Sequence, residues 1–367
     1  MKQYDYLIVG AGLFGSVFAH EAIKKGKTCL VVERRAHVAG NVYTEKVEGI
    51  DVHRYGAHIF HTSDKRIWEY VNSFATFNSF VNSPIADYRG ERYPLPFNMN
   101  TFHTLWGVTT PEEAKRIIGE QTAASGIDVP HNLEEQALRL VGRDIYEKLI
   151  KGYSEKQWGR PCKELPPFLL SRIPLRFTYD NNYYDDTFQG IPIVGYTPII
   201  EKMLEGADVL TNTDYFEFIK GHAGIAKKTV FTGAIDEYFG GCYGGLQYRS
   251  LRFETEILPM ADYQGNAVVN YTAREVPYTR IIEHKHFTFD KGDKTVITRE
   301  YSVMRQAGDE PYYPINDAEN NEIYAKYRAL ALTRDDVLFG GRLGEYKYYD
   351  MDEVIASALT LAEKELS

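Results

Sequence analysis

The start of the chain alternates short apolar runs with a turn rich in glycine. An apolar run at Tyr6–Val9 is followed by the turn Gly10–Gly15, an amphipathic stretch as far as Lys25, and a second apolar run at Thr28–Val32. Buried strands are typically short apolar runs, and a helix that packs on a sheet has apolar residues every three or four positions. This order therefore predicts a strand, a helix and a second parallel strand, the βαβ unit.

The pattern changes to helical periodicity between about Val71 and Arg143, where the alternation typical of strands is absent. One helix is predicted to begin at Asn132, because Glu135 stands three residues further on, as in a capping box. We expect this part of the chain to form a helical insertion.

Patterns typical of strands return in the second half of the chain. Several β-rich stretches, separated by charged turns, lie between Tyr248 and Thr298 and include Ala267–Asn270. Such spacing favours an antiparallel sheet. Near the end, Val337–Gly341 and a helix that begins near Met351 repeat the order of strand, glycine turn and helix found at the start.

The composition excludes some classes of protein. With 367 residues, the chain is longer than one ordinary domain of about 100 to 200 residues. It carries 42 Lys and Arg against 51 Asp and Glu, and the resulting net charge of -9 argues against general binding to nucleic acid. An anionic ligand would need basic groups gathered locally. The 28 tyrosines favour a polar site lined by aromatic side chains.

The cysteines and the apolar runs bear on location. The chain has an odd number of cysteines, namely Cys29, Cys162 and Cys242, and no two of them form a C-x-x-C pair. Neither a disulfide framework nor a zinc site is therefore predicted. A reducing cytoplasm fits this cysteine usage best. No run approaches the roughly 18 apolar residues that a membrane span requires, so no membrane span is expected.

The glycine turn has the G-x-G-x-x-G spacing. It contains Gly10, Gly12 and Gly15, and the acidic Glu33 ends the second strand. This context predicts a dinucleotide site, because the glycines let backbone amides at a helix start approach a pyrophosphate, while the carboxylate accepts from a ribose hydroxyl. A purely structural glycine turn is the alternative.

The residues after Glu33 indicate which dinucleotide binds. Arg34, Gly40 and Asn41 complete an E-R-x(5)-G-N pattern that resembles FAD-dependent monooxygenases and oxidases. FAD is therefore the predicted cofactor. Because a single fingerprint is present, NAD(P)H is expected to act only as a transient reductant.

Two histidines follow the βαβ unit. His58 and His61 stand three residues apart, a spacing that can bind a metal on a helix. Ile59 and Phe60 between them, without a third ligand nearby, make a metal the weaker interpretation. We predict no metal and a position beside the cofactor, and a structural histidine is the alternative.

Aromatic and basic residues suited to a nucleotide lie in separate segments. Tyr153 and Trp158 form an aromatic pair that can stack on a base, although core packing is an equal alternative. Arg172 and Arg176 lie beside a proline-containing loop, and Arg280 lies in another segment. Guanidinium groups clamp diphosphates bidentately, so these arginines are candidates for holding one.

Five runs carry a family resemblance, namely Val9–Gly15, Gly56–Thr62, Lys151–Gly159, Pro277–Lys285 and Gly341–Asp350. Through them the chain is similar, over nearly its whole length, to the prokaryotic UDP-galactopyranose mutase family. The resemblance implies an enzyme, usually a homodimer, that uses reduced FAD to interconvert UDP-galactopyranose and UDP-galactofuranose for cell-surface glycans. It also implies a reaction without net oxidation, through a covalent adduct between flavin N5 and the sugar.

The resemblance further implies an α/β fold of three domains. Residues 1–75, 191–245 and 325–367 are expected to form a Rossmann-like FAD-binding domain. Residues 76–170 are expected to form an inserted, mainly helical domain. Residues 171–190 and 246–324 are expected to form an antiparallel β-sheet domain that binds substrate, with a mobile loop near 166–178.

Position by position, the resemblance implies which residues bind substrate and cofactor. On the substrate side these are Asn82, Tyr153, Ser154, Trp158, Arg172, Tyr183, Asn270, Arg280, Tyr313 and Tyr348. On the cofactor side these are Gly10, Gly12, Phe14, Gly15, Glu33, Arg34, Gly40, Asn41, His58, Ile59, Phe218, Arg342, Tyr349, Asp350 and Met351. The implied catalytic residues are Arg172 and Arg280 at the diphosphate and His61 beside the flavin.

Two other functions stay open at this point. An FAD-dependent oxidoreductase of the amine-oxidase type shares the fingerprint, but it is expected to have an apolar substrate channel rather than a site rich in Arg, Tyr and Asn. A flavin-binding protein without catalysis would leave that polar cluster without a purpose.

Leu149 and Ile150 stand where some relatives have aromatic residues beside the uridine, so base stacking at those positions is not expected.

Overall fold

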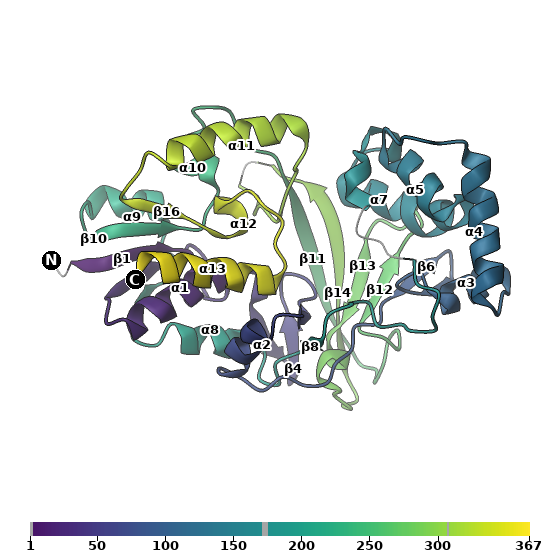
Figure 1. The fold of residues 1–367 in the computed structure, drawn as a ribbon. Helices are drawn as coiled ribbons and strands as arrows, with labels where there is room; N and C mark the ends of the chain where they lie inside the picture. The colour runs from purple at the N-terminus through teal and green to yellow at the C-terminus, as the bar shows by residue number, and fades with distance from the viewer. Residues whose placement is uncertain (1–2, 171–174, 307) are drawn as a thin grey trace. The chain divides into compact units, whose positions relative to one another are not determined.

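A computed structural model describes residues 3–170, 175–306 and 308–367 of the chain (Figure 1). These residues divide into two compact units. Unit 1 comprises Met1–Ser79, Asp186–Ser250 and Arg305–Ser367, and unit 2 comprises Phe80–Asp185 and Leu251–Met304. Each unit is therefore assembled from segments that are far apart in the sequence.

Unit 1 is built on a parallel sheet in the order β16–β10–β1–β2–β9. All neighbouring strands in this sheet run parallel. Its strands are β1 (Tyr4–Val9), β2 (Cys29–Val32), β9 (Asp208–Leu210), β10 (Ala226–Phe231) and β16 (Val337–Phe339). The predicted βαβ unit is thereby confirmed, with α1 (Leu13–Lys24) as its helix.

Helices cover both faces of this sheet, as parallel sheets require because their strands are apolar on both sides. On one face, Ile8 and Val31 pack with residues of α1, α8 (Thr197–Met203) and α13 (Met351–Glu365). On the other face, Leu7 and Leu30 pack against α9 (Tyr215–Gly221). Figure 1 shows α1 and α13, the first and last helices, side by side.

Smaller elements complete unit 1. It also contains two separate two-stranded antiparallel sheets, β3–β4 and β5–β8. The bounds are β3 (Thr44–Val47), β4 (Ile50–His53), β5 (Phe60–Thr62), α2 (Lys65–Asn72), β8 (Phe188–Gly190), α10 (Ile235–Tyr238), β15 (Tyr313–Pro314), α11 (Ala318–Ala331) and α12 (Gly341–Gly344).

Unit 2 contains most of a second, largely antiparallel sheet. The strand order is β15–β11–β14–β13–β12–β6–β7, and β15 pairs with the first residues of β11, which belong to unit 1. The one parallel pair recorded among the described strands of this sheet joins β12 to β6. The remaining bounds are β6 (Ile85–Tyr88), β7 (Glu91–Pro94), β11 (Tyr248–Leu258), β12 (Val268–Tyr271), β13 (Arg280–Glu283) and β14 (Thr295–Met304).

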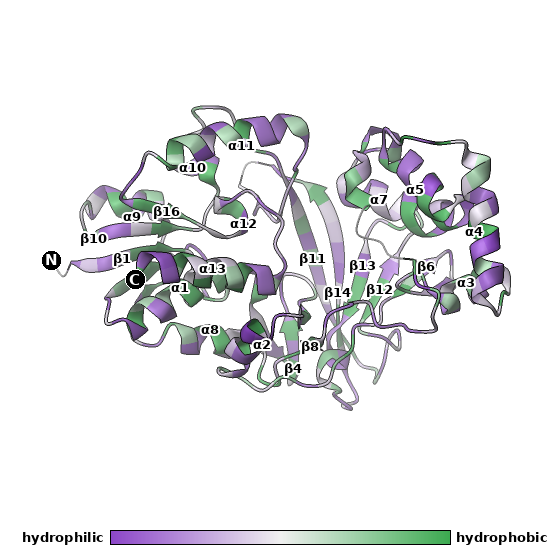
Figure 2. Cartoon of the chain, viewed as in Figure 1, coloured by the Kyte–Doolittle hydropathy of each residue, from purple (hydrophilic) through white to green (hydrophobic). Residues whose placement is uncertain are grey.

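The α-helices of unit 2 and one π-helical turn lie within residues 99–158, and short 3-10 helices follow at Cys162–Glu164, Pro167–Leu170 and His284–Thr288. Those within residues 99–158 are α3 (Met99–Trp106), α4 (Pro111–Ser125), α5 (Leu133–Val141), α6 (Arg143–Ile145), the π-helical turn (Tyr146–Ile150) and α7 (Lys151–Trp158). The predicted helix start is confirmed, since the side chain of Asn132 accepts from the amide of Glu135 at 2.9 Å. Within α4 only Ala114 and Ile118 are buried, and its surface is otherwise largely hydrophilic (Figure 2).

One expectation about this region is wrong. Residues 71–143 were expected to lack strands, but Ile85–Tyr88 and Glu91–Pro94 form a β-hairpin. Its turn has Arg89 at φ 56° and Gly90 at φ 89°. The first strand of the hairpin, β6, also pairs with β12, which is far away in the sequence. A strand that is stabilised by such a distant neighbour gives little local signal.

The α/β fold class is confirmed by the parallel sheet with its covering helices and by the separate antiparallel sheet. The division into three domains stays a prediction. In the described part of the chain, no helix combines the length and apolar character needed to cross a membrane.

Candidate functional site

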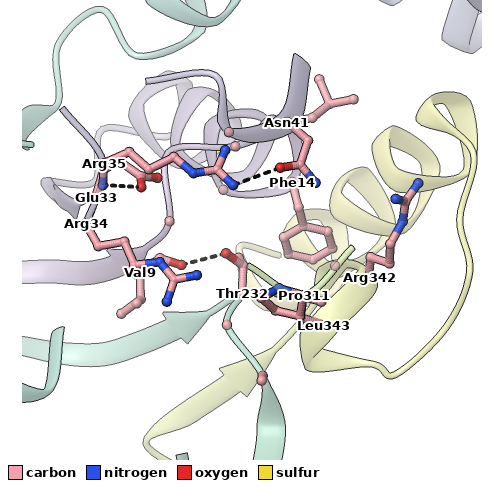
Figure 3. Close-up of a pocket in the computed structure, with 18 of the residues that line it drawn as sticks. Val9, Phe14, Glu33, Arg34, Arg35, Asn41, Thr232, Pro311, Arg342 and Leu343 are labelled. Carbon is pink, nitrogen blue, oxygen red and sulfur yellow. Dashed lines mark hydrogen bonds between the residues drawn. The ribbon is translucent and has the colours of Figure 1, made fainter. Parts of the chain in front are cut away.

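A pocket in unit 1 opens where the parallel strands end. Its lining includes Val9, Val32 and Phe231, which are the last residues of β1, β2 and β10 (Figure 3). Ligands of open α/β sheets bind at this carboxyl edge, where helix N-termini and loops meet. The pocket is therefore the candidate cofactor site.

The glycine turn brings backbone, rather than side chains, to the pocket. Gly10 has φ 101°, and a Cβ there would lie 2.3 Å from the hydroxyl oxygen of Thr232. A Cβ on Gly15 would lie 2.1 Å from the carbonyl oxygen of Gly10. Helix α1 starts directly after Gly12, which has no side chain to cap it. The first-turn amides are thus suited to an anionic group such as a pyrophosphate.

Glu33 is held in a fixed orientation at the end of β2. Its side chain is buried, with one carboxylate oxygen accepting from the amide of Ala11 and the other from the amide of Arg35, both at 2.9 Å. A buried carboxylate placed beside the glycine turn fits the acceptor that a ribose hydroxyl needs.

Arg35 is a pocket residue that the sequence reasoning missed. Its Nη2 donates to Oδ1 of Asn41 at 3.0 Å (Figure 3). Its guanidinium carbon lies 4.3 Å from the centre of the Tyr55 ring. Its Nη1 is buried without a hydrogen-bond partner among the described residues. A buried cationic donor of this kind fits an anionic or acceptor group of a bound dinucleotide. The neighbouring Arg34, which was predicted, pairs with Glu310 and also lines the pocket.

The C-terminal glycine turn forms another wall of the pocket. Arg342 donates from Nη2 to the carbonyl oxygen of Tyr349 at 2.6 Å. A Cβ on Gly340 would lie 2.1 Å from the ring of Phe14, so glycine is needed for this close approach. The predicted cofactor residues that line the pocket are Gly10, Gly12, Phe14, Gly15, Glu33, Arg34, Gly40, Asn41, His58, Arg342, Tyr349 and Met351.

Three predicted cofactor residues lie elsewhere among the described residues. Ile59 is buried, Phe218 stacks on His222 against the sheet, and Asp350 caps α13. The start of α9, Thr213–Phe216, lines the pocket without having been predicted. It carries no glycine or charge motif that would have distinguished it from any other helix start.

His61 forms a hydrogen-bonded pair with a carboxylate. Its Nδ1 lies 2.6 Å from Oδ2 of Asp186, and Oδ1 of Asp186 accepts from the hydroxyl of Ser63 at 2.7 Å. Strand β5 carries His61 and Asp186 precedes β8, the strand that pairs with it. Nearby, burial raises the pKa of Asp352, while a hydrogen bond from Thr62 and the charge of His61 oppose this rise.

In unit 2, Asn270 and Arg280 face each other across β12 and β13. Arg280 donates from Nη2 to Oε2 of Glu300 at 2.7 Å, and the Glu300 side chain is only 2% exposed. Oδ1 of Asn270 is buried without a hydrogen-bond partner in the described part of the chain. A fixed guanidinium beside an unused acceptor suits a ligand with both phosphate and hydroxyl groups.

The other predicted substrate residues fall into both units. In unit 2, Tyr153, Ser154 and Trp158 lie on α7, and the amide of Tyr183 donates to the carbonyl oxygen of Asn82 at 2.8 Å. In unit 1, the rings of Tyr313 and Tyr348 stack with centres 5.6 Å apart, and Arg342 lies over both. Arg172 lies outside the described residues.

Comparison with known proteins identifies the family. A sequence profile described as UDP-galactopyranose mutase matches residues 148–348, more than half of the chain. A probable UDP-galactopyranose mutase of Klebsiella pneumoniae is 39% identical over 371 residues, covering 100% of this chain and 96% of the relative. The chain belongs to the UDP-galactopyranose mutase family.

Further comparisons find a relative named for another nucleotide sugar and a profile for the dinucleotide-binding domain. A dTDP-fucopyranose mutase of Escherichia coli is 37% identical and covers 97% of both chains. A profile for an NAD(P)-binding Rossmann-like domain matches residues 8–74. The chain is thus also similar to a protein that is named for a different nucleotide sugar.

The fold is shared more broadly. A crystal structure of reduced UDP-galactopyranose mutase superimposes with a TM-score of 0.75 at 15% identity, covering 100% of this chain and 94% of the other. A redesigned putrescine oxidase reaches 0.57 at 12% identity, with 99% of each chain covered. At such identities the likeness concerns the fold alone.

Proposed function

We propose that this chain is a flavin-dependent mutase that interconverts UDP-galactopyranose and UDP-galactofuranose without net oxidation. Membership of the UDP-galactopyranose mutase family is the observation that carries the proposal. The unit 1 pocket supports FAD as the cofactor, because the glycine turn, Glu33 and the unpaired Nη1 of Arg35 fit a dinucleotide. When bound and reduced, FAD supplies the nucleophile for the anomeric carbon.

The residues of the pocket would hold the cofactor by its polar groups. The amides of the turn between Gly10 and Gly15 would bind its pyrophosphate at the start of α1. Glu33, fixed by the amides of Ala11 and Arg35, would accept from a ribose hydroxyl. Arg342 and Tyr349, from the C-terminal turn, would border the flavin.

Arg280 would hold the substrate diphosphate, together with Arg172. Glu300 fixes the Arg280 guanidinium in its buried ion pair, so little reorganisation is needed when charge develops on the departing diphosphate. Holding UDP in place between cleavage and recapture also keeps the two fragments at high effective concentration. The buried Oδ1 of Asn270 would accept from a hydroxyl of the nucleotide or sugar.

His61 would act beside the flavin. The hydrogen bond between Nδ1 and Asp186 fixes the ring orientation and leaves Nε2 to face the other way. Asp186 therefore holds the proton at Nδ1, and Nε2 is the atom that can accept or share a proton with a bound group.

The biological setting belongs to the same proposal. We place the enzyme in the cytoplasm, as a homodimer that supplies galactofuranose for cell-surface glycans, with NAD(P)H as a transient reductant. Family resemblance and cysteine usage support these points.

A second substrate is favoured by one specific observation. The relative named dTDP-fucopyranose mutase matches nearly as well as the one named for UDP-galactopyranose, at 37% against 39% identity. The two substrates differ at the base, at the ribose 2′ position and at the sugar C6 substituent. The amine-oxidase alternative rests only on a fold similarity at 12% identity.

Conversion of each nucleotide sugar by the purified protein tests which of the two is the substrate. Purified protein with FAD, reduced by dithionite, is incubated separately with UDP-galactopyranose and dTDP-fucopyranose, and the products are separated by chromatography. We expect UDP-galactofuranose, with a kcat/KM at least about tenfold above that for the dTDP sugar. A preference for the dTDP sugar would overturn the substrate, and oxidation of an amine with neither conversion would overturn the mutase.

A further inference from the structure

Helix α7 packs closely on the loop formed by residues 271–278, which joins β12 to β13. A Cβ on Gly152 of α7 would lie 2.3 Å from the carbonyl oxygen of Thr272, so only glycine permits this approach. The hydroxyl of Thr272 donates to the carbonyl oxygen of Lys148 at 2.7 Å. The helix and the loop are therefore in backbone contact within unit 2.

Lys156, on the last turn of α7, holds this loop together. The carbonyl oxygens of Tyr271, Ala273, Val276 and Tyr278 lie 2.6, 2.9, 3.0 and 2.9 Å from its Nζ, so these four acceptors share the three N–H donors of the ammonium group. Four carbonyl dipoles that point at one place repel each other unless a cation lies between them. Lysine has three donors on a compact charge, which suits convergent acceptors better than a planar guanidinium does.

The neighbours of Lys156 on α7 make further contacts in unit 2. Oε2 of Glu155 accepts from Arg274 of the same loop at 2.7 Å. The carbonyl oxygen of Gln157 accepts from the hydroxyl of Ser302 on β14 at 2.6 Å. Three consecutive residues thus bind the loop or the sheet.

Burial lowers the pKa of Lys156 to about 8, although the charge of Glu275 acts to raise this pKa. Lys156 is therefore mainly a cation at pH 7.

The elements joined by Lys156 carry predicted substrate residues. Tyr153 and Trp158 lie on α7, while Asn270 and Arg280 lie at the two ends of the loop. The geometry points to Lys156 as a positioning residue, which sets the nucleotide-binding side chains of α7 relative to Asn270 and Arg280. This inference rests on the proposed function, because it takes a nucleoside diphosphate as the ligand of these residues.

Lys285 is a matched control. It is a buried lysine in the same unit, and its ammonium donates to the carbonyl oxygens of Ala261, Gly292 and Lys294 at 2.7, 2.6 and 2.9 Å. None of these three residues is predicted to bind substrate or cofactor. Loss of Lys285 should therefore cost stability in the same way as loss of Lys156, without moving substrate residues.

The test compares Lys156→Met with Lys285→Met in full-length protein carrying FAD. Dissociation constants for UDP are measured by calorimetry at pH 7, below the unfolding temperature of each variant. We expect both variants to retain FAD and both to unfold at lower temperature. Only Lys156→Met should bind UDP about tenfold or more weakly, with KM raised, because the loss of charged hydrogen bonds lets the loop shift.

A second pair covers the case in which a methionine variant does not fold. Lys156→Arg keeps the charge but not the convergent geometry, and Lys285→Arg is its control. In whichever pair folds, UDP dissociation constants that agree within about twofold would overturn the positioning role. If wild-type protein binds FAD but not UDP, the proposed function itself fails, which is a separate outcome.

Discussion

At the scale of single residues, the diphosphate-binding role of Arg280 is open to a clean substitution. Removal of the whole side chain would leave the buried Glu300 without its cation, which destabilises proteins by about 3 to 5 kcal/mol. Arg280→Lys keeps a positive charge near Glu300 but removes the bidentate fork. We predict that this variant retains FAD and folds, while kcat falls by about a hundredfold or more.

The measurement combines product chromatography with the absorbance of bound flavin. Arg252→Lys is a suitable control, since Arg252 is an exposed arginine on β11 that pairs with Glu254. Normal turnover by Arg280→Lys would remove Arg280 from the account of diphosphate binding.

The carboxylate behind His61 gives a second residue-scale prediction. Asp186→Asn keeps the shape but loses the charged hydrogen bond to Nδ1. We expect kcat to fall by about tenfold, because the imidazole ring loses the charged partner that fixes its orientation. Ser63→Ala removes only the hydroxyl that binds the other oxygen of Asp186 and should have a smaller effect. Equal kcat values in Asp186→Asn and wild type would show that Asp186 does not orient His61 for the reaction.

Single residues also show what the sequence could and could not predict. The glycine spacing and Glu33 have a local pattern, and these residues line the pocket as that pattern implies. Arg35 was missed because its importance depends on its contact with the Tyr55 ring and on its buried Nη1, which has no hydrogen-bond partner among the described residues. Only the folded chain reveals either feature. Asp186 was missed for the same reason, since the pairing of β5 and β8 brings it to His61 from 125 residues away.

At the scale of elements, the close packing of α1 on β1 depends on glycine. A Cβ on Gly15 would lie 2.1 Å from the carbonyl oxygen of Gly10 and 3.1 Å from a methyl group of Ile8. Neither neighbour is the end of a flexible side chain, so Gly15→Ala must push the helix away from the strand. We predict a loss of bound FAD, measured by flavin absorbance after gel filtration.

Helix α4 supplies the control for this prediction. Gly119 lies inside α4, and a Cβ there would meet nothing within 4 Å. Because alanine has the higher helix propensity, Gly119→Ala should stabilise the protein by up to about 1 kcal/mol and leave FAD content unchanged. Full FAD content in Gly15→Ala would contradict the packing argument.

Elements with strong local signals were predictable. The strand, glycine turn and helix at each end of the chain have apolar periodicity and turn residues, and both were found. The hairpin of β6 and β7 was not predicted, because its inner strand depends on pairing with β12. The π-helical turn at Tyr146–Ile150 was not predicted either, since no local pattern distinguishes it from an α-helix.

At the scale of the whole molecule, a buried carboxylate links stability to pH. Glu283 is fully buried, and burial acts to raise its pKa. The nearby His286 and hydrogen bonds from Thr295 and the amides of Gln264 and Tyr263 nevertheless lower the pKa to about 2. A carboxylate with a lowered pKa contributes stability above its usual pKa, and this contribution is lost as the pH falls towards 2.

We therefore predict that stability falls between about pH 4.5 and pH 2, by about 3 kcal/mol from this group. Urea unfolding across that range should show a smaller decline in Glu283→Gln, which cannot titrate. Nε2 of His286 lies 3.3 Å from Oε2 of Glu283 and 3.5 Å from Oδ2 of Asp262, and the pKa of His286 is raised chiefly by its pairing with Glu283. Its contribution should be lost as the pH rises above about 6.5. If the stability of Glu283→Gln and that of wild type fell equally between pH 4.5 and pH 2, the predicted contribution of Glu283 would be contradicted.

Whether the protein is a redox-neutral mutase that uses reduced flavin can be decided by measuring product and reductant in the same reaction. UDP-galactofuranose is incubated with the purified FAD-containing protein, with and without dithionite, and UDP-galactopyranose and remaining reductant are both quantified. We predict conversion that requires reduction but consumes far less than one equivalent of reductant per product. Consumption of one equivalent per turnover, or no conversion by a protein whose flavin reduces normally, would contradict it.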